Sequence, residues 1–339
     1  IDPVTGEIGL HATPTVARDV VIVGGQGRTC NDDPACINRL HPDIPMAARA
    51  RPGQTIVFHT RNASDFDLDP ASTYVDPRAD GPHVSTVHPL TGPVYIEGAE
   101  AGDVLAVTLL DIEPGPFGYT SLSSIGFISD QFDETLRLLW RLNRTEAVSD
   151  DLPGVRIPNN SFPGVITVLP GRAQLDEILA RETALAAVGG AVFAPEPANA
   201  TPAQVCGTDA PGAGECLRTI PPREHGGNLD IRYFGVGVTV YLPCYLDGCG
   251  LAVGDLHFAQ GDGEVSGTAI EMKADVARIS HSPPFDPINS RKTPVITSCF
   301  LVLPRKAVAT SRSFQTHRNW KIPNAAMAGI ISGSITRVK

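Results

Sequence analysis

Three stretches of the sequence concentrate side chains that bind cations or move protons. The stretch GDLHFAQGDGE (residues 254–264) holds two aspartates, a histidine, a glutamine and a glutamate between glycines. EHGGNLD (224–230) adds a second mixed group, and TVHPLTGP (86–93) contributes His88. Carboxylates and imidazoles coordinate divalent cations, and a carboxylate can also act as a general base. These residue types therefore predict a cation site or an acid–base centre.

The spacing within the longest stretch favours side chains that act together. Asp255 and His257 are two residues apart, so on a strand they point to the same face. Asp262 and Glu264 have the same spacing. The intervening glycines allow tight turns and a close approach of the backbone to a ligand. A carboxylate and an imidazole on one face would form part of a metal site.

Each motif also has an ordinary structural explanation. The Asp-x-His pair is compatible with a solvated strand edge, GDGE with a hairpin turn, and HGGN with a turn whose histidine is satisfied. Taken one at a time, these explanations are favoured. Three such groups between residues 224 and 264, each beside an apolar run, favour a common site instead.

The elements that must position these groups are mostly strands. The chain has 30 prolines and 33 glycines, which favours frequent turns and a β-rich fold. We expect a mainly β protein, a jelly-roll-like β-sandwich with a few inserted helices. The expected elements are strands in 19–25, 51–64, 264–279 and 293–304, hairpins in 92–114 and 235–255, and helices in 131–144 and 173–187.

Composition limits the possible partners. The 339 residues are enough to bury a large core, and 42% of them are hydrophobic. A formal net charge of -10 argues against nucleic acid or an anionic membrane as the main partner. No apolar run approaches the length of a membrane-spanning helix.

The seven cysteines predict three local disulfides. The pairs Cys30–Cys36, Cys206–Cys216 and Cys244–Cys249 each bracket a short polar or turn-like loop, and Cys299 remains as a buried thiol. Disulfides imply a secreted or periplasmic protein whose leader has been removed, rather than a cytoplasmic one. The alternative is a set of reduced, unpaired cysteines in a cytosolic protein.

Four ordered stretches resemble the acetamidase/formamidase family. They are HPLTGPVYIEGAEAGDVLAVTLLDIEP, PNNSFPGVITVLPG, HGGNLD and GDLHFAQGDGEVSGTAIE, and the resemblance runs from about residue 41 to 280. It implies hydrolysis of a small linear amide to a carboxylic acid and ammonia, with a divalent metal, zinc or calcium, and a homo-oligomer, usually a dimer. We divide the chain into an N-terminal strand and disulfide loop (1–40), the family domain (41–305) and a C-terminal extension (306–339).

Carried onto this sequence, the resemblance and the chemistry of the side chains suggest roles for nine residues. We expect Asp230, Asp255 and His257 to bind the metal, with His88 or His225 completing the shell. Glu264 is the expected general base, and Gln260 or Asn228 the group that stabilises the developing oxyanion. Asp262 is counted among the candidate metal ligands.

Two other classes of function remain open. One alternative is a secreted calcium-dependent binding module, which the Asp-rich loops and the cysteine pairs, unusual for the family, would suit. An inactive family relative within a larger assembly is another. A nucleophilic mechanism is disfavoured, because the chain has no GxSxG motif and Cys299 lies in the apolar run VITSCFLVL.

Overall fold

The computed structural model describes residues 20–65, 85–122, 126, 130–131 and 136–281. The strand expected in 293–304, Cys299 and the C-terminal extension 306–339 lie outside the described residues. The division of the chain into three parts stays a prediction. In the described part, the residues before 41 pair with the rest of the fold, since Cys36–Ile37 pairs with Leu90–Ile96.

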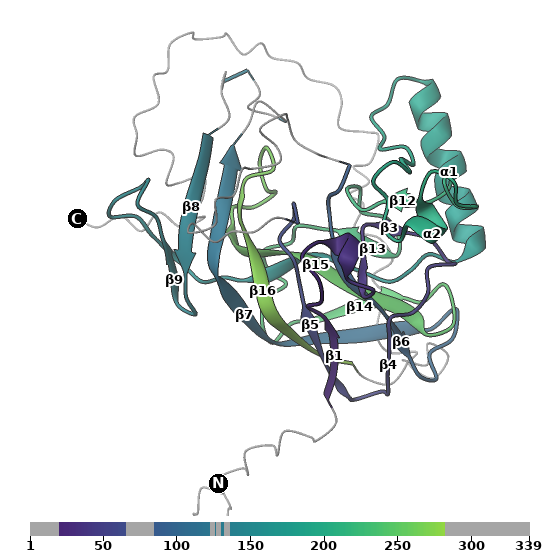
Figure 1. Ribbon diagram of the computed structural model, residues 1–339, viewed down its shortest axis with the longest axis horizontal. Coiled ribbons are helices and arrows are strands. Elements are labelled where there is room, and N and C mark those ends of the chain that lie inside the picture. The colour runs from purple at the N-terminus through teal and green to yellow at the C-terminus, as the bar shows by residue number, and fades with distance from the viewer. Residues whose placement is uncertain (1–19, 66–84, 123–125, 127–129, 132–135, 282–339) are drawn as a thin grey trace, which may run out of the picture.

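The described residues form a mainly β fold, as the sequence predicts (Figure 1). The helical elements are a 3-10 turn, η1 (Cys30–Asp32), and two α-helices, α1 (Arg172–Ala187) and α2 (Ala203–Cys206). The strands are β1 (Val20–Gly24), β2 (Cys36–Ile37), β3 (Arg39–Leu40), β4 (Ala48–Ala50), β5 (Thr55–His59), β6 (Leu90–Ile96), β7 (Val104–Leu122), β8 (Leu136–Leu142), β9 (Glu146–Val148), β10 (Arg156–Pro158), β11 (Phe162–Thr167), β12 (Leu217–Arg218), β13 (Gly226–Asn228), β14 (Thr239–Pro243), β15 (Cys249–Gln260) and β16 (Ala269–His281).

Most strands belong to one branched, largely antiparallel sheet. Its main path runs β10-β9-β8-β7-β16-β15-β11-β13, and β3 and β12 form a separate two-stranded sheet. The strand β15 lies at the centre, because it pairs with β11, β16 and β6. All twelve of its residues are buried. Side chains that β15 carries are therefore held in the interior of the protein.

The core has two parts. The larger cluster lies among the strands of the branched sheet and includes Phe58, Trp140 and Phe258. The smaller cluster packs α1 against the sheet through Leu175 and Ile178. Figure 1 shows α1 at the outer side of the molecule, beside α2, β3 and β12. The helix predicted in 173–187 is confirmed.

The helix predicted in 131–144 is wrong where the structure describes it. Residues 136–142 form β8, which pairs with β7 and β9. Leu138, Trp140 and Leu142 are buried, whereas Arg137 and Arg141 are exposed. This two-residue alternation is the pattern of a strand with one buried face, and it outweighs the helical spacing of the leucines.

The two predicted hairpins contain correct strands but incorrect pairings. β6 pairs with β15, and β7 pairs with β14, so the partners are exchanged between the two segments. The connection 97–103 lies against the connection 244–248, where Gly248 donates its N–H to the Ala99 carbonyl and Cys244 donates to Asp103. Both connections are thus corners between different parts of the sheet. A hairpin does form between β15 and β16.

The three predicted disulfides are all present in the structure. They join Cys30 to Cys36, Cys206 to Cys216, and Cys244 to Cys249. All six cysteines are buried. Among the described residues, no helix is long and apolar enough to span a bilayer.

Candidate active site

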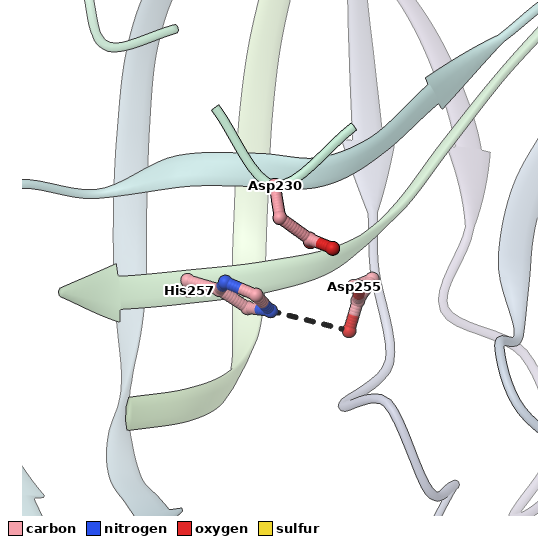
Figure 2. Close-up of side chains that lie close together, drawn as sticks. All are labelled: Asp230, Asp255 and His257. Carbon is pink, nitrogen blue, oxygen red and sulfur yellow. Dashed lines mark ion pairs between the residues drawn. The ribbon is translucent and has the colours of Figure 1, made fainter. Parts of the chain in front are cut away.

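Carboxylates and an imidazole from three segments meet near the end of β15. Asp255 and His257 lie on β15, Asp230 follows β13, and Glu271 lies on β16. Figure 2 shows the side chains of Asp230, Asp255 and His257 directed toward one another. The His257 Nε2 atom is 3.5 Å from Asp255 Oδ1 and 3.3 Å from Glu271 Oε1. We call this group, together with His88 and Glu264, the acidic cluster.

The other two members approach the cluster from loops. His88 precedes β6, and its Nε2 atom lies 3.8 Å from Asp255 Oδ2. Glu264 lies in the turn between β15 and β16, beside the carboxyl group of Asp230. Glu264 and Asp230 are half-buried, whereas Asp255 and Glu271 are buried, so these first two carboxylates have access to solvent as well as to the buried groups.

A glycine opposite β15 makes the close approach of two carboxylates possible. A Cβ atom on Gly164 of β11 would lie 2.6 Å from Asp255 Oδ2 and 2.8 Å from Asp230 Oδ1. Any larger residue would push one or both carboxylates away. The carbonyl of Gly164 also accepts hydrogen bonds from the backbone N–H groups of Leu229 and Asp230. Residue 164 therefore fixes the loop that carries Asp230.

The backbone at three of the acidic residues is strained. Asp230, Asp255 and Glu264 have φ angles of 47°, 53° and 43°, in the left-handed region that favours glycine. For a residue with a Cβ atom this conformation costs roughly 1 kcal/mol or more. Strained non-glycine residues concentrate at functional sites, where the surrounding structure holds them in place.

Gln260 determines which nitrogen of His257 carries a proton. Its Nε2 atom donates a hydrogen bond of 2.8 Å to the Asp230 carbonyl, which can only accept. The Oε1 atom must then face His257, and it lies 2.7 Å from Nδ1. The Nδ1–H group is therefore the donor, and Nε2 is the nitrogen available to the carboxylates, to a second proton or to a cation. Phe162 packs its ring edge-to-face with the imidazole at 5.2 Å.

Negative charge exceeds positive charge in this buried group, and the pKa values reflect it. Burial and the Asp255 carboxylate raise the pKa of Asp230 to about 6. Burial also raises the pKa values of Glu264 and Glu271. Burial opposes the charge of Asp255, but the imidazoles of His88 and His257 outweigh it and hold its pKa below the usual range.

The imidazole of His257 responds in the opposite sense. Burial alone would lower its pKa, but the carboxylates of Glu271 and Asp255 outweigh this and hold the pKa well above its usual value. The cluster thus favours additional positive charge, either protons or a metal ion.

Several atoms of the cluster are buried without a hydrogen-bond partner. They include Asp230 Oδ1, Asp255 Oδ1, His257 Nε2 and Glu271 Oε2. Buried polar atoms are normally satisfied, so a convergent group of such atoms without a protein partner is suited to hold a cation. The ligand atoms of Asp230, Asp255 and His257 lie within 4.8 Å of one another, as do those of His257, Glu264 and Glu271. Both sets have the composition and proximity that a divalent cation requires.

The structure does not bring every candidate residue to the cluster. His225 is fully buried, and its Nδ1 atom lies 2.9 Å from the Thr167 hydroxyl, while Arg223 and Glu224 are its charged neighbours. Asp262 is exposed and accepts a hydrogen bond of 3.2 Å from the Tyr233 hydroxyl. Asn228 lies on β13, opposite Val165 of β11. The metal-binding and oxyanion roles suggested for these three residues stay predictions.

Sequence reasoning missed one member of the cluster, Glu271. It belongs to the stretch GTAIE, in which an isolated glutamate on a strand reads as a solvent-facing residue. In the structure it lies directly opposite His257 in the β15–β16 pairing. The register of this hairpin is the signal that could have identified it.

The fold and the cluster define a class of protein: a mainly β scaffold that buries a carboxylate–imidazole centre suited to a cation. Comparison with known proteins identifies the family. The acetamidase/formamidase family model matches residues 25–280, so the chain belongs to this family. The resemblance on which the sequence analysis relied is confirmed.

Individual relatives agree with this assignment. The chain is 35% identical over 249 residues to the formamidase of Methylophilus methylotrophus, and the match covers 69% of this chain and 61% of that protein. It is 34% identical over 261 residues to the acetamidase of Mycolicibacterium smegmatis, covering 69% and 63%. The match thus spans less than two thirds of these curated relatives.

Solved structures share the fold. A gamma lactamase from Delftia acidovorans has 37% sequence identity and a TM-score of 0.67, with 76% of this chain and 65% of that chain covered. An acetamidase from Bacillus halodurans has 26% identity and a TM-score of 0.54, covering 73% and 68%.

Proposed function

We propose that the protein hydrolyses the C–N bond of a small amide, releasing a carboxylic acid and ammonia, with a divalent cation held by the acidic cluster. The observation that carries the proposal is the convergence of buried, unpartnered carboxylate and imidazole atoms around Asp255. Membership of the family and the formamidase and acetamidase relatives support the choice of substrate class.

Asp230, Asp255 and His257 are the residues proposed to hold the cation. When bound there, a divalent cation would lower the pKa of a coordinated water and polarise the amide carbonyl. Gln260 orients His257 by accepting a hydrogen bond from Nδ1–H, so that Nε2 points into the cluster. His88 lies on the far side of Asp255 and can complete the shell. Zinc and calcium are the two cations that we propose to test first.

Glu264 is the proposed general base and acid. Its carboxylate is half-exposed and lies in the turn beside Asp230. A carboxylate in this place can accept a proton from the attacking water and return it to the leaving amine. We further propose that Gln260 or Asn228 stabilises the oxyanion. Gln260 has one amide N–H committed to the Asp230 carbonyl, which leaves the other for this task.

Ammonia release from a panel of amides tests the function. The panel is formamide, acetamide and longer linear amides, together with a γ-lactam because of the similarity to the Delftia acidovorans protein. Elemental analysis of the purified protein identifies the cation. We expect release of ammonia from at least one small amide, loss of activity on chelation, and recovery with one divalent cation.

The outcomes separate the parts of the proposal. Absence of hydrolysis for every amide in cation-replete protein would contradict the amidase function and favour a binding module or an inactive relative. Full activity after complete removal of metal would support the amidase function but exclude a role of the cation in hydrolysis. Glu264→Gln is expected to abolish turnover while the cation stays bound, and full activity of this variant would exclude the role given to Glu264.

Two further expectations remain proposals. The three disulfides support a secreted or periplasmic location, because they persist in oxidising compartments. The homodimer implied by the family resemblance can be tested by sedimentation of the purified protein.

A further inference from the structure

The segment that carries His88 into the acidic cluster lies outside regular secondary structure. Residues 85–88 precede β6, and the imidazole of His88 reaches Asp255 at 3.8 Å. A side chain on such a segment has no strand or helix to fix its position. The structure replaces these with hydrogen bonds from the small sheet β3–β12 and the residues next to it.

The first of these hydrogen bonds comes from a buried arginine that also binds two other carbonyl groups. Arg39 of β3 is completely buried, and its Nη2 atom donates a hydrogen bond of 2.9 Å to the Ser85 carbonyl. The same guanidinium donates to the carbonyl of Glu196 at 2.7 Å and, through Nη1, to the carbonyl of Asn38 at 2.8 Å. One planar group thus joins three separate segments of the backbone.

Two neighbouring side chains bind the rest of the segment. Asn38 contacts the Thr86 carbonyl at 3.4 Å and the Asn199 carbonyl at 2.9 Å through its Nδ2 atom. Thr219, directly after β12, accepts a hydrogen bond of 2.5 Å from the backbone N–H of His88 itself. Both side chains are almost completely buried.

Stability of the fold does not by itself explain a buried arginine at this position. Burying a guanidinium requires removing a charge from water, and the carboxylate that pairs with it among the described residues, that of Glu196, is 3.5 Å away and is shared with Arg218. An apolar side chain would fill the same space at lower cost. What an apolar residue cannot do is hold three carbonyl groups in fixed directions, as the guanidinium fork does.

We propose that Arg39 and Thr219, assisted by Asn38, are positioning residues for His88. They act through the backbone of residues 85–88 and hold the imidazole against Asp255. The proposal rests on the proposed function, in which His88 belongs to the active site. Loss of either residue is expected to impair turnover more than substrate binding.

The sharpest variant is Thr219→Val, since valine keeps the branched shape of threonine and removes the hydroxyl that accepts the hydrogen bond from the His88 N–H group. We expect kcat for the best amide substrate to fall about 10- to 100-fold, with a smaller change in KM. Thr219→Ser retains the hydroxyl and should recover most of the activity. Thr108→Val is the matched control. It makes the same substitution and also removes a hydrogen bond, but that bond joins the hydroxyls of Thr108 and Thr239 on β7 and β14 and does not involve His88.

Arg39→Lys tests the guanidinium. Lysine keeps the charge but cannot span three carbonyl groups, so kcat should fall by a similar factor. If this variant does not fold, the Thr219 series decides alone. Thermal melts of every variant show whether lost activity reflects unfolding.

A double-mutant cycle separates positioning from general stabilisation. In a His88→Ala background, Thr219→Val should change kcat by less than about twofold, because its target is gone. The same loss in both backgrounds would overturn the proposal. So would a Thr219→Val enzyme with wild-type kcat.

Failure of the proposed function would give a different result. In that case the wild-type protein releases no ammonia from any amide. The proposal then depends on crystal structures of wild type and Thr219→Val: displacement of His88 from Asp255 supports it, and an unchanged segment 85–88 overturns it.

Discussion

At the scale of single residues, the site depends on a glycine, Gly164, as much as on the acidic residues, because a side chain at this position would displace them. Asp255 lies on β15 and Asp230 in the loop after β13, yet their carboxylates face the same point in Figure 2. They can do so because residue 164 of the intervening strand is a glycine. Two like charges held this close in a buried place repel each other, so the packing must hold them there or a cation must join them.

Gly164→Ala should therefore damage the site without a change in any ligand. The new methyl group would overlap the positions of Asp255 Oδ2 and Asp230 Oδ1. Displacing reacting groups by about 1 Å can cost about 100-fold in rate, and we expect a loss of this order together with weaker cation binding.

Ammonia release and cation stoichiometry measure the two effects. Gly214→Ala serves as the control, because nothing lies within 4 Å of the Cβ position at Gly214. A Gly164→Ala protein with wild-type activity and cation content would show that the carboxylates do not need this space.

His225 gives a prediction about pH and stability. Its burial and the nearby Arg223 lower the pKa of its imidazole to about 3 from the usual 6.5. The folded protein therefore keeps His225 neutral while the unfolded chain binds a proton below about pH 6.5. The associated stability is complete above pH 6.5 and is lost as pH falls toward 3.

The variant His225→Gln removes this titration and can keep a hydrogen bond with Thr167. Its melting temperature should fall less steeply between pH 6.5 and 3 than that of the wild type. Parallel profiles for the two proteins would mean that His225 does not titrate differently on folding.

The residue scale also shows what the sequence could reveal about the site. Asp230, Asp255 and His257 stand out because charged groups are scarce beside apolar runs. Glu271 does not stand out, because nothing local distinguishes it from a glutamate facing solvent. Only its pairing opposite His257 makes it part of the site. Asp262 shows the converse case. It belongs to the most conspicuous motif of the sequence, but in the structure it lies in a turn and is exposed to solvent.

At the scale of elements, strands were predictable where pairings were not. The apolar runs of β6, β7, β14 and β15 identify these four strands correctly. Their short connections suggest hairpins, since local pairing has the lowest entropy cost. The fold instead stacks the two connections and exchanges the partners, which lets β15 be buried from both sides. Such an exchange depends on contacts about 150 residues apart that no local pattern encodes.

The strand β8 can be tested by its two faces. Trp140 is fully buried, and its Nε1 atom donates a hydrogen bond of 2.9 Å to the Thr120 hydroxyl. Trp140→Ala should lower the free energy of unfolding by about 3–5 kcal/mol. Arg141→Ala, on the exposed face, should change it by less than about 1 kcal/mol even though it removes the ion pair with Asp150.

Urea unfolding of both variants measures the difference. Similar destabilisation by the two substitutions would contradict the alternation of buried and exposed residues that defines β8.

At the scale of the whole molecule, three disulfides reinforce a fold built mainly from long-range pairings. Each closes a loop of ten residues or fewer. One of them, Cys244–Cys249, lies at the corner between β14 and β15, and β15 carries the acidic cluster. This bond thus holds one of the two connections at which strand partners are exchanged.

The bond between Cys206 and Cys216 allows a quantitative test. It closes a loop of sequence separation 10 next to α2, and both cysteines belong to the smaller core cluster. The loss of chain entropy on cross-linking such a loop corresponds to about 2–3 kcal/mol. The double variant Cys206→Ser/Cys216→Ser should therefore unfold at a lower urea concentration than the oxidised wild type.

Refolding the wild type under reducing conditions should lower the urea midpoint of unfolding further, because all three bonds are then absent. If the oxidised and reduced proteins unfold at the same urea concentration, the disulfides contribute nothing to the stability of the fold.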